Sequence, residues 1–215
     1  MKLEKLFSCL SILAGGFISN ALAAQDASEL SHIQQRWAEV TYQLEGKTQL
    51  SAFDQLVAEV EELSASQPDS AEAWIWSGIV KSTYAGAKGG LGALGLAKEA
   101  KVDLEHAITI DAAALAGSSY ATLGTLYHSV PRWPVGFGDQ NKAEELLRKG
   151  IALNPAGIDN NYFYGTYLLD QKRYEEAEKY LNQAKQASPR PNRPVADAGR
   201  QHEVDEALEL LRQKR

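Results

Sequence analysis

The chain repeats itself with a period of 34 residues, and this limits it to a small set of stacked-repeat folds. Segment 142–155 reads KAEELLRKGIALNP, and segment 176–189 reads EAEKYLNQAKQASP. Both place small residues, a leucine and a proline at equivalent positions, namely Ala143, Leu147, Gly150 and Pro155 against Ala177, Leu181, Ala184 and Pro189. A third copy has Ala100, Leu104 and Ala107 at the first three of these positions. Because one such unit cannot bury its own apolar face, neighbouring units must stack to form the core.

A glycine beside a large side chain precedes each of these segments, at Gly78, Gly124 and Gly165. A small residue there lets two helices of a hairpin approach closely. The period, the small residues and the terminal proline together form the pattern of the tetratricopeptide repeat (TPR). From residue 24 onward, apolar residues recur every three or four positions, and no segment shows the period-two alternation of a strand. We therefore predict an all-α, TPR-like α-solenoid of antiparallel helix hairpins.

Two of the repeats are longer than the third. The spacing from the glycine to the first small residue of the next helix is 12 residues in the last repeat, but 19 and 22 in the two before it. The extra residues predict two loop insertions between paired helices, at 85–95 and 130–140. Equivalent turns of a solenoid lie along one edge, so we expect both loops side by side on one rim. Loops of this kind often carry function.

The two ends of the chain lie outside the repeat domain, which we place at residues 24–188. Residues 1–23 combine a lysine-flanked start, a short apolar run and small residues at 21 and 23, the pattern of a cleaved signal peptide. We therefore predict a periplasmic or secreted protein, without a membrane span in the mature chain. Residues 189–215 should form a stiff, proline-rich linker and a capping helix from about residue 195 to 212.

Composition and motifs argue against several classes of function. The net charge of −6 gives no electrostatic footprint for nucleic acid. The four histidines lack metal-ligand spacing, and Cys9 is the single cysteine, so we expect no metal and no cofactor. The G-x-G-x-x-G string at 90–95 follows a helix rather than a strand, so we interpret it as a turn, with a backbone anion nest as the alternative. No nucleophile elbow or P-loop occurs, and we predict no enzyme, although a catalytic triad assembled only in space stays an alternative.

Candidate binding residues lie on the groove-facing positions of two first helices and on the second insertion. His128 has an equally weighted alternative, a histidine satisfied at a helix end. Trp133 is either an aromatic anchor over the groove or, with Phe137, a tether that holds the long loop. The candidate ligand- or partner-binding residues are Thr125, His128, Arg132, Trp133, Asp159, Tyr162 and Thr166.

Three runs of the sequence resemble a known family. They are GSSYATLGTLYHSVPRWPVGFGDQNKAEELL at 117–147, NPAGIDNNYFYGTYLL at 154–169 and PRPNRPVADAGRQHE at 189–203. These runs resemble the TatT-like periplasmic TPR proteins, which are grouped with the T-component of tripartite (TRAP-type) transport systems. The resemblance implies an all-α TPR fold, a binding rather than a catalytic role, and an extracytoplasmic solute-binding protein as a partner.

We therefore expect an exported, non-catalytic adaptor that recognises a protein or peptide through its groove and rim loops. One alternative is a periplasmic accessory of a TRAP-type transport system that binds a small organic or apolar solute, and a second is a hydrolase. An enclosed pocket under the two rim loops favours the solute, whereas an open polar groove favours a protein or peptide ligand.

Overall fold

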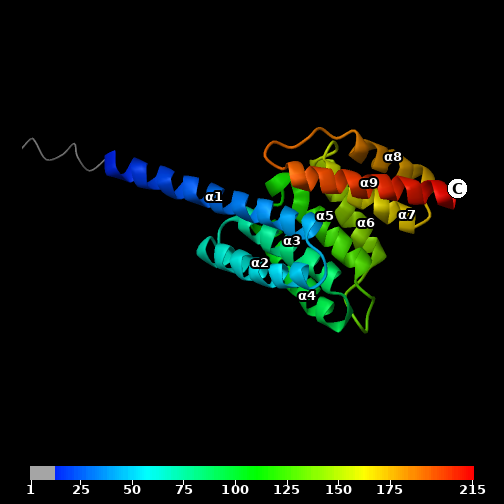
Figure 1. Cartoon of the computed structure of the whole chain (residues 1–215), viewed down its shortest axis with the longest axis horizontal. Helices are drawn as coiled ribbons and strands as arrows, with labels where there is room; N and C mark the ends of the chain where they lie inside the picture. Colours follow the sequence, from blue (N-terminus) through cyan, green and yellow to red (C-terminus); the bar gives the residue numbers. More distant parts are fainter. Residues whose placement is uncertain (1–12) are drawn as a thin grey trace, which may run out of the picture.

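The computed structural model describes residues 13–215, with the side chains of 27–215 except that of Leu91. This part of the chain forms nine helices and contains no strand (Figure 1), which confirms the predicted all-α class. The helices are α1 (Leu13–Gln43), α2 (Gly46–Ser66), α3 (Ala71–Lys88), α4 (Gly90–Ile110), α5 (Ala114–Ser129), α6 (Gln140–Leu153), α7 (Ile158–Asp170), α8 (Tyr174–Lys185) and α9 (Pro194–Lys214).

The predicted signal peptide, residues 1–23, falls partly outside the described residues, and the rest of it forms the first turns of α1. These turns extend beyond the body of the molecule (Figure 1). Within the described residues, no helix combines the length and the apolarity that crossing a membrane requires.

Three hairpins form the solenoid, and each pairs a glycine of its first helix with a leucine of its second. A Cβ atom added at Gly78, Gly124 or Gly165 would lie 2.5, 2.7 or 2.9 Å from the nearest leucine side-chain atom. The three leucines, Leu104, Leu147 and Leu181, are buried. Since real Cβ atoms do not approach so closely, only glycine permits this helix spacing. The role predicted for the three glycines is confirmed.

The first predicted insertion is not a loop. Helix α3 continues to Lys88 and α4 begins at Gly90, so Gly89 alone separates the two helices. Gly89 and Gly90 have φ angles of 62° and 63°, in the left-handed region that glycine adopts readily, and the chain reverses there. The alanines and leucines on either side favour helix, so the extra residues lengthen both helices of this hairpin instead of forming a rim loop.

The second predicted insertion is a loop, and it occupies residues 130–139 between α5 and α6. The ring of Phe137 packs edge-on against Tyr127, with their centroids 5.3 Å apart, and this contact tethers the loop. A Cβ atom added at Gly136 would lie 3.4 Å from the side chain of Leu94, near the start of α4. The two insertions are therefore neighbours, as expected, although one of them is helical.

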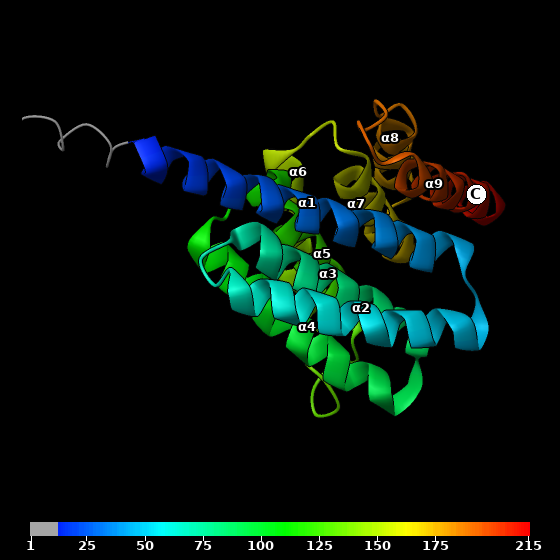
Figure 2. The same ribbon diagram turned by 60° about the vertical axis from the view of Figure 1, so that its left-hand side comes forward.

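The C-terminal helix α9 joins the two ends of the solenoid. Val204, Leu208 and Leu211 are buried in the core formed with α7 and α8, which confirms the predicted cap. The first half of α9 continues onto α1, where Ala196 lies in the same core as Trp37. Figures 1 and 2 show α9 running alongside α7 and α8 and reaching α1. The solenoid is thereby closed on itself.

The linker before α9 is not the extended spacer that its prolines predicted. The backbone N–H of Arg190 donates to Asp197 at 2.6 Å, and Asn192 has a φ of 62°. The backbone N–H of Arg193 donates to the carbonyl of Arg190 at 3.4 Å. These contacts fold the linker into a turn against the start of α9.

Candidate functional site

Closure of the solenoid leaves a cavity of about 1150 Å³. Its walls come from the groove-facing sides of α1, α3, α5 and α7, while α9 and the linker close it on the remaining side. Residues 130, 131 and 135 of the rim loop and the start of α4 also line it. The site therefore lies inside the repeat array, and residues far apart in the sequence build it.

Most of the cavity wall is made of apolar or small side chains. These include Phe53, Ile79, Leu94, Ala121, Leu126 and Val135. Gly86 on α3 also lines the cavity, and a Cβ atom added there would meet nothing within 4 Å. Hydroxyl groups from Ser82, Thr122 and other residues of α3 and α5 also reach this side, but most of its surface is apolar, so a ligand there can bury mainly apolar surface.

One end of the cavity is strongly charged, with Asp159 at its centre. Asp159 lies in the first turn of α7, and its carboxylate accepts a hydrogen bond from Nε of Arg200 at 2.8 Å and one from Arg190. Burial opposes ionisation of Asp159, but the two guanidinium groups outweigh it and hold its pKa below the ordinary value. Asp159 is therefore an ionised carboxylate that holds two arginines at the cavity wall.

Arg200 links this charged end to the aromatic residues of α7. Its guanidinium lies 4.5 Å from the ring centroid of Tyr162 and 4.6 Å from that of Phe163. It also pairs with Glu203, which accepts a hydrogen bond from the Tyr42 hydroxyl at 3.4 Å. Burial raises the pKa of Glu203 despite the neighbouring arginine. These contacts join α1, α7 and α9 where the array closes.

Arg193 differs from these two arginines because it stacks on aromatic rings instead of pairing with a carboxylate. Its guanidinium lies 5.1 Å from the ring centroid of Trp76 and 6.0 Å from that of Trp37. Its Nε atom is buried and has no hydrogen-bond partner among the described residues. Burial, and then the charge of Arg190, lower the pKa of Arg193 from its ordinary value. Arg193 lines the cavity without a direct ion pair among the described residues, and the charges of Asp159 and Asp197 offset its burial only in part.

Three of the residues predicted for the site line this cavity. They are Thr125 on α5 and Asp159 and Tyr162 on α7. The Thr125 hydroxyl donates to the carbonyl of Ala121 at 2.9 Å, so it is satisfied within its own helix. Thr166, one turn beyond Tyr162, is not among the lining residues and donates to the carbonyl of Phe163.

His128 lies outside the cavity and has partners on both ring nitrogens. Nδ1 lies 2.7 Å from the side-chain oxygen of Gln140, and Nε2 lies 2.8 Å from a carboxylate oxygen of Asp170. The ring also packs edge-on against Tyr167, with centroids 5.2 Å apart. His128 joins the ends of α5 and α7 to the start of α6, which matches the alternative of a histidine satisfied at a helix end.

Arg132 and Trp133 project from the rim loop and do not line the cavity. The Trp133 side chain is 85% exposed, so it tethers nothing within the described part of the chain. Phe137 alone has the tethering role that was considered for both aromatic residues. Any ligand that Arg132 and Trp133 bind would therefore contact the outer surface of the rim loop, and their role in binding stays a prediction.

Arg193, Arg200 and the two tryptophans beneath Arg193 line the cavity without having been predicted from the sequence. Arg193 belongs to the predicted linker and Arg200 to the predicted capping helix, where the apolar stripe marks other positions as buried. One signal was present, since three arginines fall within the eleven residues 190–200. Among the described residues, no group of three or more potential ligands could hold a metal ion. The site offers cationic, aromatic and apolar contacts, which suit binding.

A model of the tetratricopeptide repeat matches residues 158–191, which span α7, α8 and the start of the linker. The chain carries a tetratricopeptide repeat. TPR proteins generally act as non-catalytic scaffolds for protein interaction. With its stacked hairpins, this chain is an all-α, TPR-like solenoid.

Two solved structures are similar to this TPR chain. "Crystal structure of MamA" has a TM-score of 0.45 and 16% identity, covering 76% of this chain and 89% of that one. "Crystal structure of MamA protein" has a TM-score of 0.43 and 16% identity, covering 87% and 92%. Among curated proteins, none matches the sequence. The resemblance to TatT-like proteins stays a prediction.

Proposed function

We propose that this TPR protein is a non-catalytic binding protein that holds a small, mainly apolar solute in the cavity of its closed solenoid. The observation that carries the proposal is the return of α9 to α1, which converts an open groove into a cavity of about 1150 Å³. The cavity keeps an open mouth beside Gly86 and Val135, which are both exposed, so a small molecule can enter the space bounded by α1, α3, α5, α7 and α9.

The dimensions and the wall of the cavity support a small ligand. Sites for small molecules usually measure about 300–1000 Å³ and have mostly apolar walls with a few polar groups, and this cavity of about 1150 Å³ lies just above that range. Each Å² of apolar ligand surface removed from water contributes about 25 cal/mol to the free energy of binding. Contacts with wall residues such as Ile79, Leu94 and Leu126 therefore favour an apolar solute. The lining combines aliphatic and aromatic side chains with charged groups at one end, an arrangement that suits holding a ligand.

The test uses the neutral apolar fluorophore N-phenyl-1-naphthylamine. Its emission rises on transfer from water to an apolar site, so titration of the purified protein should give a saturable increase with one site per chain. Competition by decan-1-ol should reverse the increase. A linear, non-saturating signal, or no signal at all, would contradict a solute-binding cavity.

Export is a further part of the proposal. The lysine-flanked apolar run and the small residues at 21 and 23 support a cleaved signal peptide and a periplasmic location. N-terminal sequencing of the protein from periplasmic extract should begin at Ala24 or within two residues of it. An intact Met1 on protein from the cytoplasmic fraction would contradict export.

A second candidate function is docking of a protein partner on the rim loop. Trp133 and Val135 are 85% and 61% exposed, and exposed aromatic residues are typical anchors in interfaces. The partner implied by the TatT-like resemblance is an extracytoplasmic solute-binding protein, and together the two would serve a TRAP-type transport system. A photo-crosslinking residue at position 133 should then capture a defined partner in intact cells, whereas one at Lys179 on α8 should not. Equal labelling at both positions would exclude specific docking at the loop.

A further inference from the structure

Three hydrogen-bonding groups without partners lie together at the charged end of the cavity. They are Nε of Arg193, the indole Nε1 of Trp76 and the hydroxyl of Thr41, and each is buried with no hydrogen-bond partner among the described residues. All three residues contribute to the cavity lining, and the three unpaired atoms themselves are buried directly behind that surface. Buried polar groups are normally paired, so a cluster of three unpaired groups beside a large cavity needs an explanation.

The positions of these residues make them one cluster. The guanidinium of Arg193 lies over the ring of Trp76, 5.1 Å from its centroid, and 6.0 Å from that of Trp37. Thr41 follows Trp37 by four residues on α1, which places the two on the same face of that helix. Arg193 comes from the linker, Trp76 from α3 and Thr41 from α1, so the cluster forms only because the solenoid closes.

Within the described residues no carboxylate forms a direct ion pair with Arg193, although the charges of Asp159 and Asp197 favour its charged form from a longer distance. Asp159 forms ion pairs with Arg190 and Arg200. Asp197 forms an ion pair with Nε of Arg190 and also accepts a hydrogen bond from its backbone N–H. Within the described residues, no ion pair or hydrogen bond engages the guanidinium of Arg193, which stays beside the cavity as a cation on an aromatic platform. A buried, unpaired charge is costly, and an anion supplied by a ligand would remove that cost.

From this arrangement we infer that Arg193, with Trp76 and Thr41 beside it, binds the carboxylate of an amphiphilic ligand whose apolar chain fills the rest of the cavity. The inference rests on the proposed function and narrows it to a class of ligand, a monocarboxylate with an aliphatic tail. Arg193 supplies planar N–H donors that suit a carboxylate, and the apolar wall around Leu94 and Leu126 takes the tail. A cationic amphiphile would be repelled by the same guanidinium.

The test compares decanoate with decan-1-ol as competitors of N-phenyl-1-naphthylamine. The two ligands share one aliphatic chain and differ in the head group, so their relative affinity reports on the head-group site. We expect the unmodified protein to bind decanoate about tenfold more tightly or better, because a charge-assisted hydrogen bond is lost with the alcohol. In Arg193→Met the preference should disappear while the affinity for decan-1-ol stays unchanged, because methionine still packs on Trp76.

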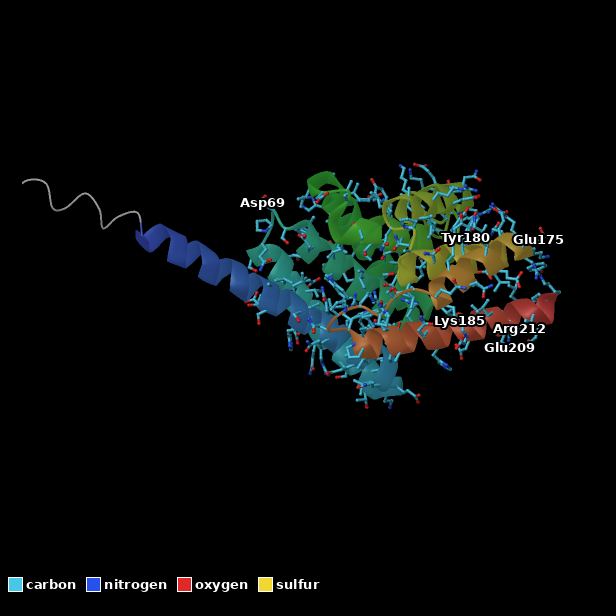
Figure 3. The ribbon with its side chains drawn as sticks, turned by 90° about the horizontal axis from the view of Figure 1, so that it is seen from above. Asp69, Glu175, Tyr180, Lys185, Glu209 and Arg212 are labelled. Carbon is cyan, nitrogen blue, oxygen red and sulfur yellow. The ribbon has the colours of Figure 1, made fainter. Side chains whose placement is uncertain are left out.

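Arg212→Met is the matched control. Arg212 lies on the outer side of α9 (Figure 3), where its side chain is 70% exposed and pairs with Glu209, so this variant should keep the preference for decanoate. If Arg193→Met does not fold, Arg193→Lys replaces it, and this variant should lose part of the preference because lysine lacks the planar fork.

The outcomes separate the two proposals. Equal binding of decanoate and decan-1-ol by the unmodified protein would overturn the carboxylate site and leave the solute-binding cavity standing. A preference for decanoate that survives in both Arg193→Met and Arg193→Lys would overturn the role of Arg193. Failure of both amphiphiles to compete would contradict the proposed function itself.

Discussion

The ring of Tyr42 on α1 lies so close to Gly199 on α9 that a Cβ atom added at Gly199 would be 2.3 Å from a ring carbon. The hydroxyl of the same tyrosine donates to Glu203, one turn further along α9. Tyr42 and Gly199 are thus the point where the first and last helices of the array meet. The cavity exists because this contact holds α9 against α1.

Gly199→Val should loosen the closure. The added side chain collides with the Tyr42 ring at the atoms nearest to the backbone of α1, which cannot easily move away, so α9 must shift. We expect the free energy of unfolding to fall by about 1–3 kcal/mol from overpacking. Thermal unfolding and titration with N-phenyl-1-naphthylamine should show a lower midpoint together with weaker binding. Gly95→Val on α4 is the control, since its Cβ would meet nothing within 4 Å. A Gly199→Val protein as stable and as competent as this control would show that the contact does not close the array.

Gly124→Ala and Gly95→Ala should change stability in opposite directions. A Cβ atom at residue 124 would lie 2.7 Å from the side chain of Leu147, so the second hairpin should lose about 1–3 kcal/mol. At residue 95 the methyl group has space, and alanine favours a helix over glycine by about 0.5–1 kcal/mol. Urea unfolding of the two variants measures both changes. Stabilisation by Gly124→Ala would contradict the assigned packing of α5 on α6.

The hairpins could be predicted from the sequence because their determinants are local and periodic. Gly124 and Leu147 belong to neighbouring helices of one repeat, and an equivalent pair recurs at Gly165 and Leu181, with the leucines 34 residues apart and the glycines further apart because of the loop insertion. The same register predicts the groove-facing positions, of which Thr125 lines the cavity whereas His128 and Thr166 do not.

The closure and the charged end could not be predicted in this way. They depend on contacts between distant segments, such as Tyr42 with Gly199, which no periodic signal marks. Arg193 stands in an irregular linker whose path is set by its bonds to α9. The glycine-rich string at 90–95 suggested a loop because glycine is common in turns. In the structure, only Gly89 and Gly90 of this region have positive φ angles and form the turn, while the remaining glycines of the string lie within α4.

Glu144 should make stability depend on acid pH. Its carboxylate accepts hydrogen bonds from Arg173 at 2.6 Å and from Arg148 at 2.8 Å, linking the second hairpin to the third. Burial opposes ionisation, but the two arginines lower the pKa of Glu144 from 4.5 to about 2. The folded state therefore favours the ionised form of Glu144, and this preference stabilises the fold. The stabilisation is complete above the pKa that Glu144 has in the unfolded chain, and it is lost as the pH falls through the lower pKa of the folded protein.

Glu144→Gln should accordingly be less stable than the unmodified protein at neutral pH. The difference should narrow as the pH falls below 4.5 and vanish only below about 2, once the carboxyl is protonated in the folded state as well. Urea unfolding across this range provides the comparison. A stability difference that stays constant down to the lowest pH would show that ionisation of Glu144 does not contribute.

The most direct measurement of the central claim is the affinity for N-phenyl-1-naphthylamine of two variants that add the same side chain on opposite sides of one hairpin. Gly86 on α3 lines the cavity with open space before it, whereas Gly95 on α4 also has open space but does not line the cavity. Gly86→Phe should fill the site and weaken binding about tenfold or more without loss of thermal stability, because glycine is unfavourable within a helix. Gly95→Phe should bind as tightly as the unmodified protein. Undiminished binding by Gly86→Phe would contradict a ligand site inside the closed solenoid.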